Sequence, residues 1–252
     1  MTFSIIAKCS KSGAFGAAVT TSNLAVGSRC VRLAHGVGAF LSQHRTDPRL
    51  GDVGIEHLKA GLDAETAVSR TSSTVTDIEW RQLAALDTAG RGAVFHGRRM
   101  YSIHTHSMAQ NCLAVGNILA NETVTKSMAE AFSAAEDCSF ADRLLLALEA
   151  GRDAGGEIIG PLRSASLRVT GEMGIDHCDL RIDSSGTDAV GDLRALSREY
   201  RSQADLLRRV ALEPNSVPIS RALFDASVKR IRELDLVERF PSEQKADSWR
   251  IQ

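Results

Sequence analysis

Residues 2–21, TFSIIAKCSKSGAFGAAVTT, decide the fold class of this protein. Two stretches of this segment, Thr2 to Cys9 and Phe15 to Thr21, are rich in apolar and β-branched residues, as β-strands are. Lys11-Ser12-Gly13 separates them and is typical of a turn, so the segment predicts a β-hairpin. The chain is therefore expected to begin with two antiparallel strands.

Further strands and helices follow without a regular strand–helix alternation. Strands are expected at residues 36–43, 81–86, 92–96, 101–106, 112–115, 164–170 and 179–183. Helices are expected at residues 53–60, 62–69, 123–134 and 140–152, with Asp63 as the N-cap of the second. Because strands and helices come in groups, the pattern favours an α+β fold of antiparallel sheets covered by helices over a doubly wound parallel sheet.

The character of the sequence changes from about Ala189 onward. Residues 190–210 and 220–237 look helical and are rich in Arg, Glu and Leu, with Glu213-Pro214-Asn215-Ser216 between them. We predict one domain of residues 1–203 and a helical C-terminal extension of residues 204–252. The segment from Leu206 to Val237 is a candidate dimerisation element, so a homo-oligomer, dimer or higher, is expected.

Composition excludes several classes of partner and cofactor. The 252 residues include 30 basic and 31 acidic ones, so no net field attracts nucleic acid or an anionic membrane. No apolar stretch approaches the roughly 20 residues that span a bilayer, and the first residues do not form a secretory signal, so we expect a soluble, cytoplasmic protein. Five cysteines without a CxxC predict neither a zinc site nor disulfides. No phosphate-binding glycine motif precedes a helix, so no cofactor is expected.

Thr2 is the main catalytic candidate. If Met1 is removed, the Thr2 hydroxyl lies beside a free α-amine, whose ordinary pKa of roughly 7.7 to 8.0 lets it act as a base near neutral pH. One residue then supplies both the nucleophile and the base. The alternative is a β-branched residue that simply opens a strand, and a retained Met1 blocks the amine.

Two other groups of residues have side chains suited to chemistry. His104 and His106 lie on one face of an expected strand and, with His96, have the chemistry of a metal site, but a polar strand edge explains them and we predict no metal. Gly116-Asn117 follows an apolar strand, where an asparagine amide and backbone N–H groups can stabilise an oxyanion. A turn or cap residue is the structural alternative for Asn117.

An ordered set of short motifs resembles a known family, the domain of unknown function 1028. The set covers residues 2 to 200 and comprises Thr2-Phe3-Ser4-Ile5, Gly16-Ala17-Ala18-Val19, Leu24-Ala25-Val26-Gly27-Ser28, Gly36-Val37-Gly38-Ala39, Gln43, Asp47-Pro48-Arg49-Leu50-Gly51, Asp87 to Gly97, Gly116-Asn117-Ile118-Leu119, Ala154-Gly155-Gly156-Glu157, Ser164-Ala165 and Asp179-Leu180-Arg181-Ile182-Asp183. Three places depart from the family pattern: Ser22-Asn23, Glu157 in place of an aspartate, and His104-Thr105-His106.

The resemblance implies a fold and an activity. The family is similar to N-terminal-nucleophile (Ntn) hydrolases, which implies a four-layer αββα sandwich of two antiparallel sheets, with Thr2 as the nucleophile of amide-bond hydrolysis. Our hypothesis is an amidohydrolase acting on a small-molecule amide substrate. The alternative is a non-catalytic small-ligand-binding or assembly protein on the same scaffold.

The hypothesis assigns the remaining candidates to the site. Asn117 would stabilise the oxyanion, and Gln43, Ser22, Arg181 and Asp183 would line or order the substrate pocket. Arg181 has the fork geometry to bind a substrate carboxylate, although an ion pair of Arg181 with Asp183 at a strand edge explains both residues equally well.

Overall fold

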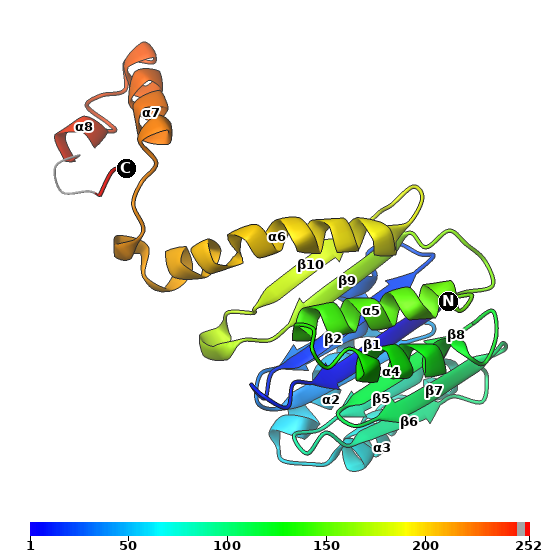
Figure 1. Cartoon of the computed structure of the whole chain (residues 1–252). Coiled ribbons are helices and arrows are strands. Elements are labelled where there is room, and N and C mark those ends of the chain that lie inside the picture. Colours follow the sequence, from blue (N-terminus) through cyan, green and yellow to red (C-terminus); the bar gives the residue numbers. More distant parts are fainter. Residues whose placement is uncertain (246–249) are drawn as a thin grey trace. The chain divides into compact units, whose positions relative to one another are not determined.

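A computed structural model describes residues 1–245 and 250–252 of the chain (Figure 1). Two compact units are present, Met1–Arg198 and Glu199–Gln252. The predicted boundary between residues 203 and 204 falls a few residues later along the chain. Residues 246–249 of the predicted extension lie outside the described residues.

The predicted N-terminal hairpin forms the centre of a six-stranded antiparallel sheet. Its strands, in spatial order, are β10 (Cys178–Ile182), β9 (Ser164–Val169), β2 (Phe15–Thr21), β1 (Thr2–Lys8), β8 (Cys112–Asn117) and β7 (His104–Ala109). The strand predicted at 101–106 begins later, at His104, because its register is set by the tight turn that pairs Ala109 with Cys112. Asn111 in that turn has a φ of 60°, a conformation that asparagine tolerates.

A second, four-stranded antiparallel sheet lies against the first. Its strands, in spatial order, are β3 (Val31–Ala34), β4 (Gly38–Gln43), β5 (Gln82–Leu86) and β6 (Gly92–His96). The hairpin of β5 and β6 is confirmed within one residue of its predicted ends. The short elements α1 (Val26–Cys30) and β3 were not predicted, since each is too short for a periodic pattern.

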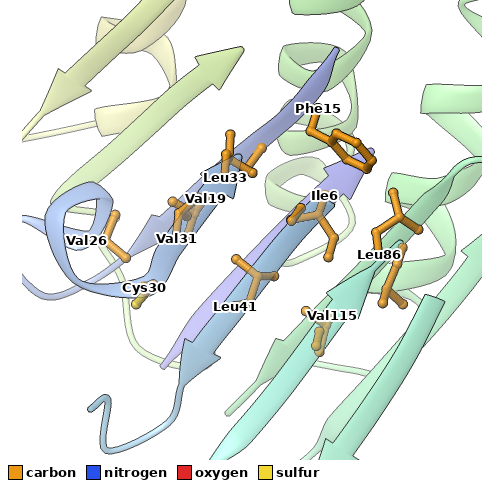
Figure 2. Close-up of a cluster of buried hydrophobic side chains, with 14 residues drawn as sticks. Ile6, Phe15, Val19, Val26, Cys30, Val31, Leu33, Leu41, Leu86 and Val115 are labelled. Atoms are coloured by element: carbon orange, nitrogen blue, oxygen red, sulfur yellow. The ribbon is translucent and has the colours of Figure 1, made fainter. Parts of the chain in front are cut away.

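The two sheets bury the main hydrophobic core between them (Figure 2). Each strand contributes alternate side chains, so that Ile6 and Val115 of one sheet meet Leu41 and Leu86 of the other. All four of these side chains are fully buried. Close packing of this kind fixes the spacing of the sheets and, with it, the positions of the strand ends.

Helices cover the outer face of each sheet. Helices α2 (Pro48–Lys59) and α3 (Ala64–Ser72) pack on the four-stranded sheet, and α4 (Val124–Ala134) and α5 (Phe140–Asp153) pack on the six-stranded sheet (Figure 1). The layer order in this unit is therefore helices, sheet, sheet, helices. The predicted N-cap is confirmed, since the Asp63 carboxylate accepts a hydrogen bond from Thr66 N at 2.9 Å. Helix α2 starts at Pro48 rather than at residue 53, because Asp47 caps it and proline fits the first turn.

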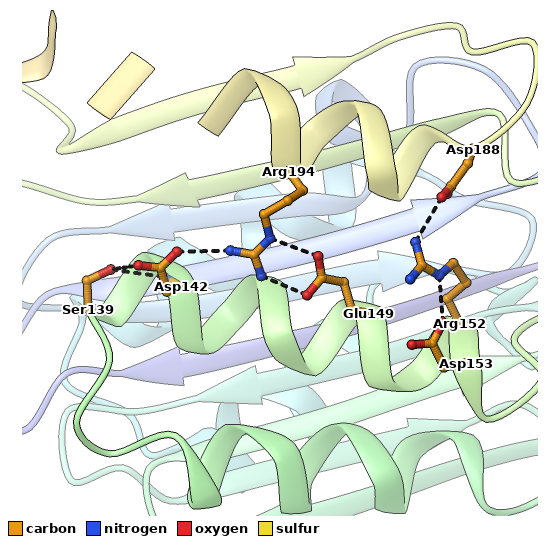
Figure 3. Close-up of polar contacts among 7 residues, drawn as sticks. All are labelled: Ser139, Asp142, Glu149, Arg152, Asp153, Asp188 and Arg194. Atoms are coloured by element: carbon orange, nitrogen blue, oxygen red, sulfur yellow. Dashed lines mark hydrogen bonds and ion pairs between the residues drawn. The ribbon is translucent and has the colours of Figure 1, made fainter. Parts of the chain in front are cut away.

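An ion-pair network joins the first turns of α6 (Ala189–Leu212) to α5 (Figure 3). The Arg194 guanidinium donates to both carboxylate oxygens of Glu149 at 2.8 Å and to Asp142 at 2.9 Å. All three side chains are at most 20% exposed, so solvent screens these contacts only in part. A second pair, Arg152 with Asp188, lies beside them.

The second unit consists mainly of helices. It contains the end of α6, α7 (Arg221–Glu233) and α8 (Ser242–Lys245), and a parallel bridge joins Ile219 to Ile251. Short 3₁₀ turns occur along the chain at Ile78–Trp80, Glu172–Gly174 and Pro214–Ser216. Across both units, none of the described helices combines the length and apolarity required to cross a membrane.

Candidate functional site

Polar residues gather where the strands of both sheets end at the Thr2 edge. Thr2 begins β1 and pairs directly with Asn117, the last residue of β8, which in turn pairs with His104. On the facing sheet, Gln43 pairs with Gln82, and Gln82 pairs with His96. Two rows of three polar residues therefore face each other at the end of the hydrophobic core. One row is Thr2, Asn117 and His104, and the other is Gln43, Gln82 and His96.

Gln82 connects the two rows through a buried hydrogen-bond network. Its Oε1 accepts from Gln43 Nε2 at 2.6 Å and from Asn117 Nδ2 at 2.9 Å. Its Nε2 donates to the Gly116 carbonyl oxygen at 2.9 Å. Ser4 Oγ donates to Gln43 Oε1 at 2.8 Å, which continues the network to β1. Gln82, Gln43, Asn117 and Ser4 are all fully buried.

The Gly116 carbonyl sets the orientation of the whole network. Because a carbonyl oxygen only accepts, the Gln82 atom facing it is Nε2, and Oε1 must face Gln43 and Asn117. Asn117 therefore presents its nitrogen to Gln82 and its Oδ1 away from it. That Oδ1 is buried and has no hydrogen-bond partner among the described residues. An unpartnered buried acceptor thus lies directly across from Thr2.

His96 and His106 extend the network toward the surface, and the His104 ring lies beside that of His96. His96 Nδ1 is 3.0 Å from Gln82 Nε2, and His96 Nε2 is 3.0 Å from His106 Nδ1. Burial, followed by the charges of His104 and His106, lowers the pKa of His96 to about 4. Neutral His96 accepts from Gln82 on Nδ1 and donates to His106 from Nε2. Among the described residues, no three His, Cys, Asp or Glu side chains are placed to hold a metal ion.

Met1 lies within the site rather than outside it. Its carbonyl oxygen accepts hydrogen bonds from the hydroxyls of both Thr2 and Thr21. Its sulfur is 3.7 Å from Ser22 Oγ. Thr2 is 5% exposed and Thr21 is 1% exposed, so both hydroxyls act away from bulk water.

Glu157 is the buried carboxylate of the site. Its Oε2 accepts from Ser22 N at 3.1 Å, while its Oε1 is buried without a described partner. Burial raises the pKa of Glu157, an effect that the Ser22 hydrogen bond and the Met1 α-amine oppose. Burial likewise lowers the pKa of the Met1 amine, and Glu157 opposes that change. The carboxylate and the amine therefore act on each other electrostatically.

The backbone is strained at the same edge. Ala25, His44, Arg45 and Ile118 all have φ between 46° and 54°. They follow the ends of β2, β4 and β8. Ile118 is the most unusual, since a β-branched residue is a clear outlier at positive φ. Such strain tends to collect at functional sites, where the surrounding structure holds it.

A polar hollow of ≈ 360 Å³ lies at the opposite end of β1, around Lys8 and Arg143. Its cations have structural partners, because Lys8 Nζ donates to the Thr88 carbonyl and Arg143 donates to that of Phe132. It contains no residue of the predicted site. The edge at Thr2 is therefore the better candidate for chemistry.

A known protein family matches most of the chain. The model of the family of unknown function DUF1028 matches residues 2–193. The chain belongs to the DUF1028 family. It is also similar to a solved DUF1028 protein from Silicibacter pomeroyi, with 34% identity and a TM-score of 0.74 over 79% of this chain and 85% of that one. No curated protein matches it.

The site of this DUF1028 chain unites four of the six predicted site residues. Thr2 and Asn117 are strand partners, Gln43 is joined to Asn117 through Gln82, and Ser22 contacts Met1. The sequence predicts an oxyanion donor in the Asn117 amide. In the structure that nitrogen already donates to Gln82, and the side-chain atom without a partner is an acceptor.

Arg181 and Asp183 lie apart from the network around Gln82 in the DUF1028 chain, although the Asp183 carbonyl oxygen accepts a hydrogen bond from Ala25 N at 3.0 Å. Arg181 is on β10, the edge strand, with β9 and β2 between it and β1. Its described ion-pair partner is Asp179 at 3.8 Å, rather than Asp183 as in the structural alternative. Both Arg181 and Asp183 are exposed, and no described contact links them to the network around Gln82.

Four residues of the site were not predicted from the sequence: Ser4, Thr21, Gln82 and Glu157. Gln82 could have been identified from its place at the start of the apolar stretch QLAAL, because a polar residue buried in such a strand requires hydrogen-bond partners. The only signal for Glu157 in the sequence is its departure from the family pattern. Nothing local distinguishes Thr21 from other strand threonines.

Proposed function

We propose that this DUF1028 chain is an amidohydrolase with an Ntn-hydrolase-like αββα fold and Thr2 as its nucleophile. The observation that carries the proposal is the position of the buried Thr2 hydroxyl, which lies at the start of β1 opposite the unpartnered Asn117 Oδ1 and contacts the Met1 carbonyl oxygen. It places a buried nucleophile beside an amide group within the site. The helix–sheet–sheet–helix layers and the strained strand ends support the same proposal.

The mechanism requires cleavage of the Met1–Thr2 bond, which frees the Thr2 α-amine. Thr2 Oγ1 then attacks the substrate carbonyl carbon, and the α-amine takes the hydroxyl proton. As the C–N bond breaks, the same proton passes to the leaving amine, and an ester on Thr2 remains. Water hydrolyses this ester and restores the Thr2 hydroxyl.

The neighbouring residues have distinct parts in this mechanism. Thr21 Oγ1, which donates to the Met1 carbonyl oxygen, would donate to the oxyanion; a good donor of this kind contributes about 3 to 4 kcal/mol. Asn117 Oδ1, the unpartnered acceptor across from Thr2, would accept from the α-amine and orient it. Gln43 and Gln82 would hold Asn117 in place without contacting substrate.

A non-catalytic ligand-binding protein is the second candidate. The observation that favours it is the pair of hydroxyl donors on the Met1 carbonyl, which would also stabilise an uncleaved Met1 in the site. With Met1 retained, Thr2 has no free amine and hydrolysis by this mechanism is blocked. Assembly into a homo-oligomer stays a prediction. Light scattering on a chain that ends at Arg201 would test whether the second unit is required for this assembly.

The deciding experiment combines intact mass with an amide-hydrolysis panel. Protein lacking Met1 should hydrolyse at least one amide, and Thr2→Ala should abolish that activity while Thr2→Ser retains part of it. Thr88→Ala, which removes an exposed threonine hydroxyl, is the matched control. Melting curves establish that each variant is folded. Full activity in folded Thr2→Ala would refute the nucleophile, and an intact Met1 would favour the binding protein.

A further inference from the structure

Met1 occupies the position that an acyl group on Thr2 would take. The Met1–Thr2 bond is an amide, and the Thr2 hydroxyl contacts its carbonyl oxygen. If the acyl group moved from the Thr2 nitrogen to Oγ1, its carbonyl carbon would be bonded to both atoms at the intermediate stage. The carbon therefore shifts little between amide and ester. The contacts of Met1 consequently outline the binding site for the acyl half of a substrate.

Each part of Met1 has its own contact in the site. The carbonyl oxygen accepts from Thr21 Oγ1, and the side-chain sulfur lies 3.7 Å from Ser22 Oγ. Ser22 contacts both Met1 and Glu157, which brings the α-amine and this carboxylate into the same part of the site, where each alters the pKa of the other. Glu157 is held from the other side by Ser22 N, which donates to its Oε2 at 3.1 Å.

Glu157 has the properties of a carboxylate that binds a cationic ligand. It is 8% exposed, and its Oε1 has no described hydrogen-bond partner. None of the ion pairs formed by the described lysines and arginines includes it. A buried carboxylate oxygen without a partner is costly, and a ligand ammonium that donates to it would offset that cost.

We propose that the substrates are amides whose acyl group carries a free α-amino group, that is, aminoacyl amides or peptides with a free N-terminus. Glu157 binds the ammonium, Thr21 binds the carbonyl oxygen, and the space beside Ser22 receives an apolar side chain the size of methionine. The inference rests on the proposed function, since it takes Thr2 as the nucleophile.

The reaction balances without any further reactant except water. Thr2 Oγ1 forms an ester to the aminoacyl carbon while the C–N bond breaks. The hydroxyl proton reaches the leaving amine through the Thr2 α-amine. Water then cleaves the ester, which returns a proton to Thr2 Oγ1 and releases a free amino acid.

The test compares two chromogenic substrates that differ only at the amino group: methionine p-nitroanilide and N-acetylmethionine p-nitroanilide. Full-length protein lacking Met1, as judged by intact mass, is assayed beside Glu157→Gln and a control, Glu122→Gln, which alters an exposed carboxylate. We expect the free-amine substrate to be preferred by about 10-fold or more in kcat/KM, the value of one charged hydrogen bond. Glu157→Gln should remove the preference by raising KM for that substrate alone.

The outcomes separate this inference from the proposed function. If both substrates are cleaved equally and Thr2→Ala abolishes both activities, the hydrolase stands and the ammonium site is refuted. If Glu157→Gln slows both substrates to the same degree, Glu157 serves the Thr2 amine instead, and the inference is again wrong.

Should neither anilide be cleaved, calorimetry with methioninamide and N-acetylmethioninamide decides the matter. Binding of methioninamide alone, lost in Glu157→Gln, would support the ammonium site while counting against hydrolysis. Absence of binding by methioninamide would overturn the ammonium site.

Discussion

Replacing Gln82 with leucine removes the residue that connects the two sheets at the site. Leucine is close to glutamine in size but makes no hydrogen bonds, so four groups lose their partner: Gln43 Nε2, Asn117 Nδ2, the Gly116 carbonyl and His96 Nδ1. Each buried polar group left unsatisfied costs about 1 to 3 kcal/mol. His96 is only partly buried and regains some hydration, so we take the low end and expect a loss of about 4 kcal/mol.

Urea denaturation followed by circular dichroism measures this loss as a lower midpoint at unchanged slope. For a unit of this size, 4 kcal/mol corresponds to a fall in Tm of about 8 to 16 °C. Gln110→Leu, which alters an exposed glutamine in the β7–β8 turn, should change the free energy of unfolding by no more than about 0.5 kcal/mol. A Gln82→Leu protein within 1 kcal/mol of wild type would show that the network is not satisfied as described.

Three further predictions concern pH, the ion pairs and helix packing. The pKa of His96 is about 4 in the folded chain, below its ordinary value near 6.5, so the unfolded chain binds more protons between these pH values and stability falls as pH drops from about 6.5 to about 4. In His96→Gln, unfolding titrations over that range should show a shallower slope; an unchanged slope would assign it to other groups. Arg194→Met leaves Glu149 without its bidentate partner and should lower the free energy of unfolding, measured by urea denaturation, by about 2 kcal/mol. A loss below about 0.5 kcal/mol would mean that hydration of Glu149 replaces the ion pair. Gly54→Ala would put a Cβ 2.2 Å from the Phe40 ring, so we expect a loss of about 1 to 3 kcal/mol, and a higher Tm would contradict the close approach of α2 to the sheet.

Sequence patterns predicted the elements whose signals are local. The β1–β2 hairpin depends on β-branched runs on either side of a turn, and the Asp63 cap depends on a contact only three residues away. Such features are stabilised by neighbours along the chain, so they can be predicted from the sequence without knowledge of the fold. Elements with weak local signals, such as α1 and β3, were missed.

The site was predicted only in part, because its contacts join distant residues. Thr2 was identified from its chemistry beside the α-amine, and Asn117 from its place after a strand. Gln82 and Asn117 are separated by 35 positions, and Ser22 and Glu157 by 135. No local pattern indicates that these side chains meet.

The sequence by itself determined most of the strands and helices, the antiparallel class of the sheets and the candidate nucleophile, since each follows from short-range propensity or from the chemistry of one residue. Tertiary structure alone decided that Gln82 faces the Gly116 carbonyl, that Asn117 therefore presents an acceptor, and that Glu157 lies beside Met1. The physical reason is register and sheet packing. A shift of one residue in any of these strands would turn its polar side chains to the opposite face of the sheet. The register of each strand is fixed by the packing of the whole core rather than by any one segment.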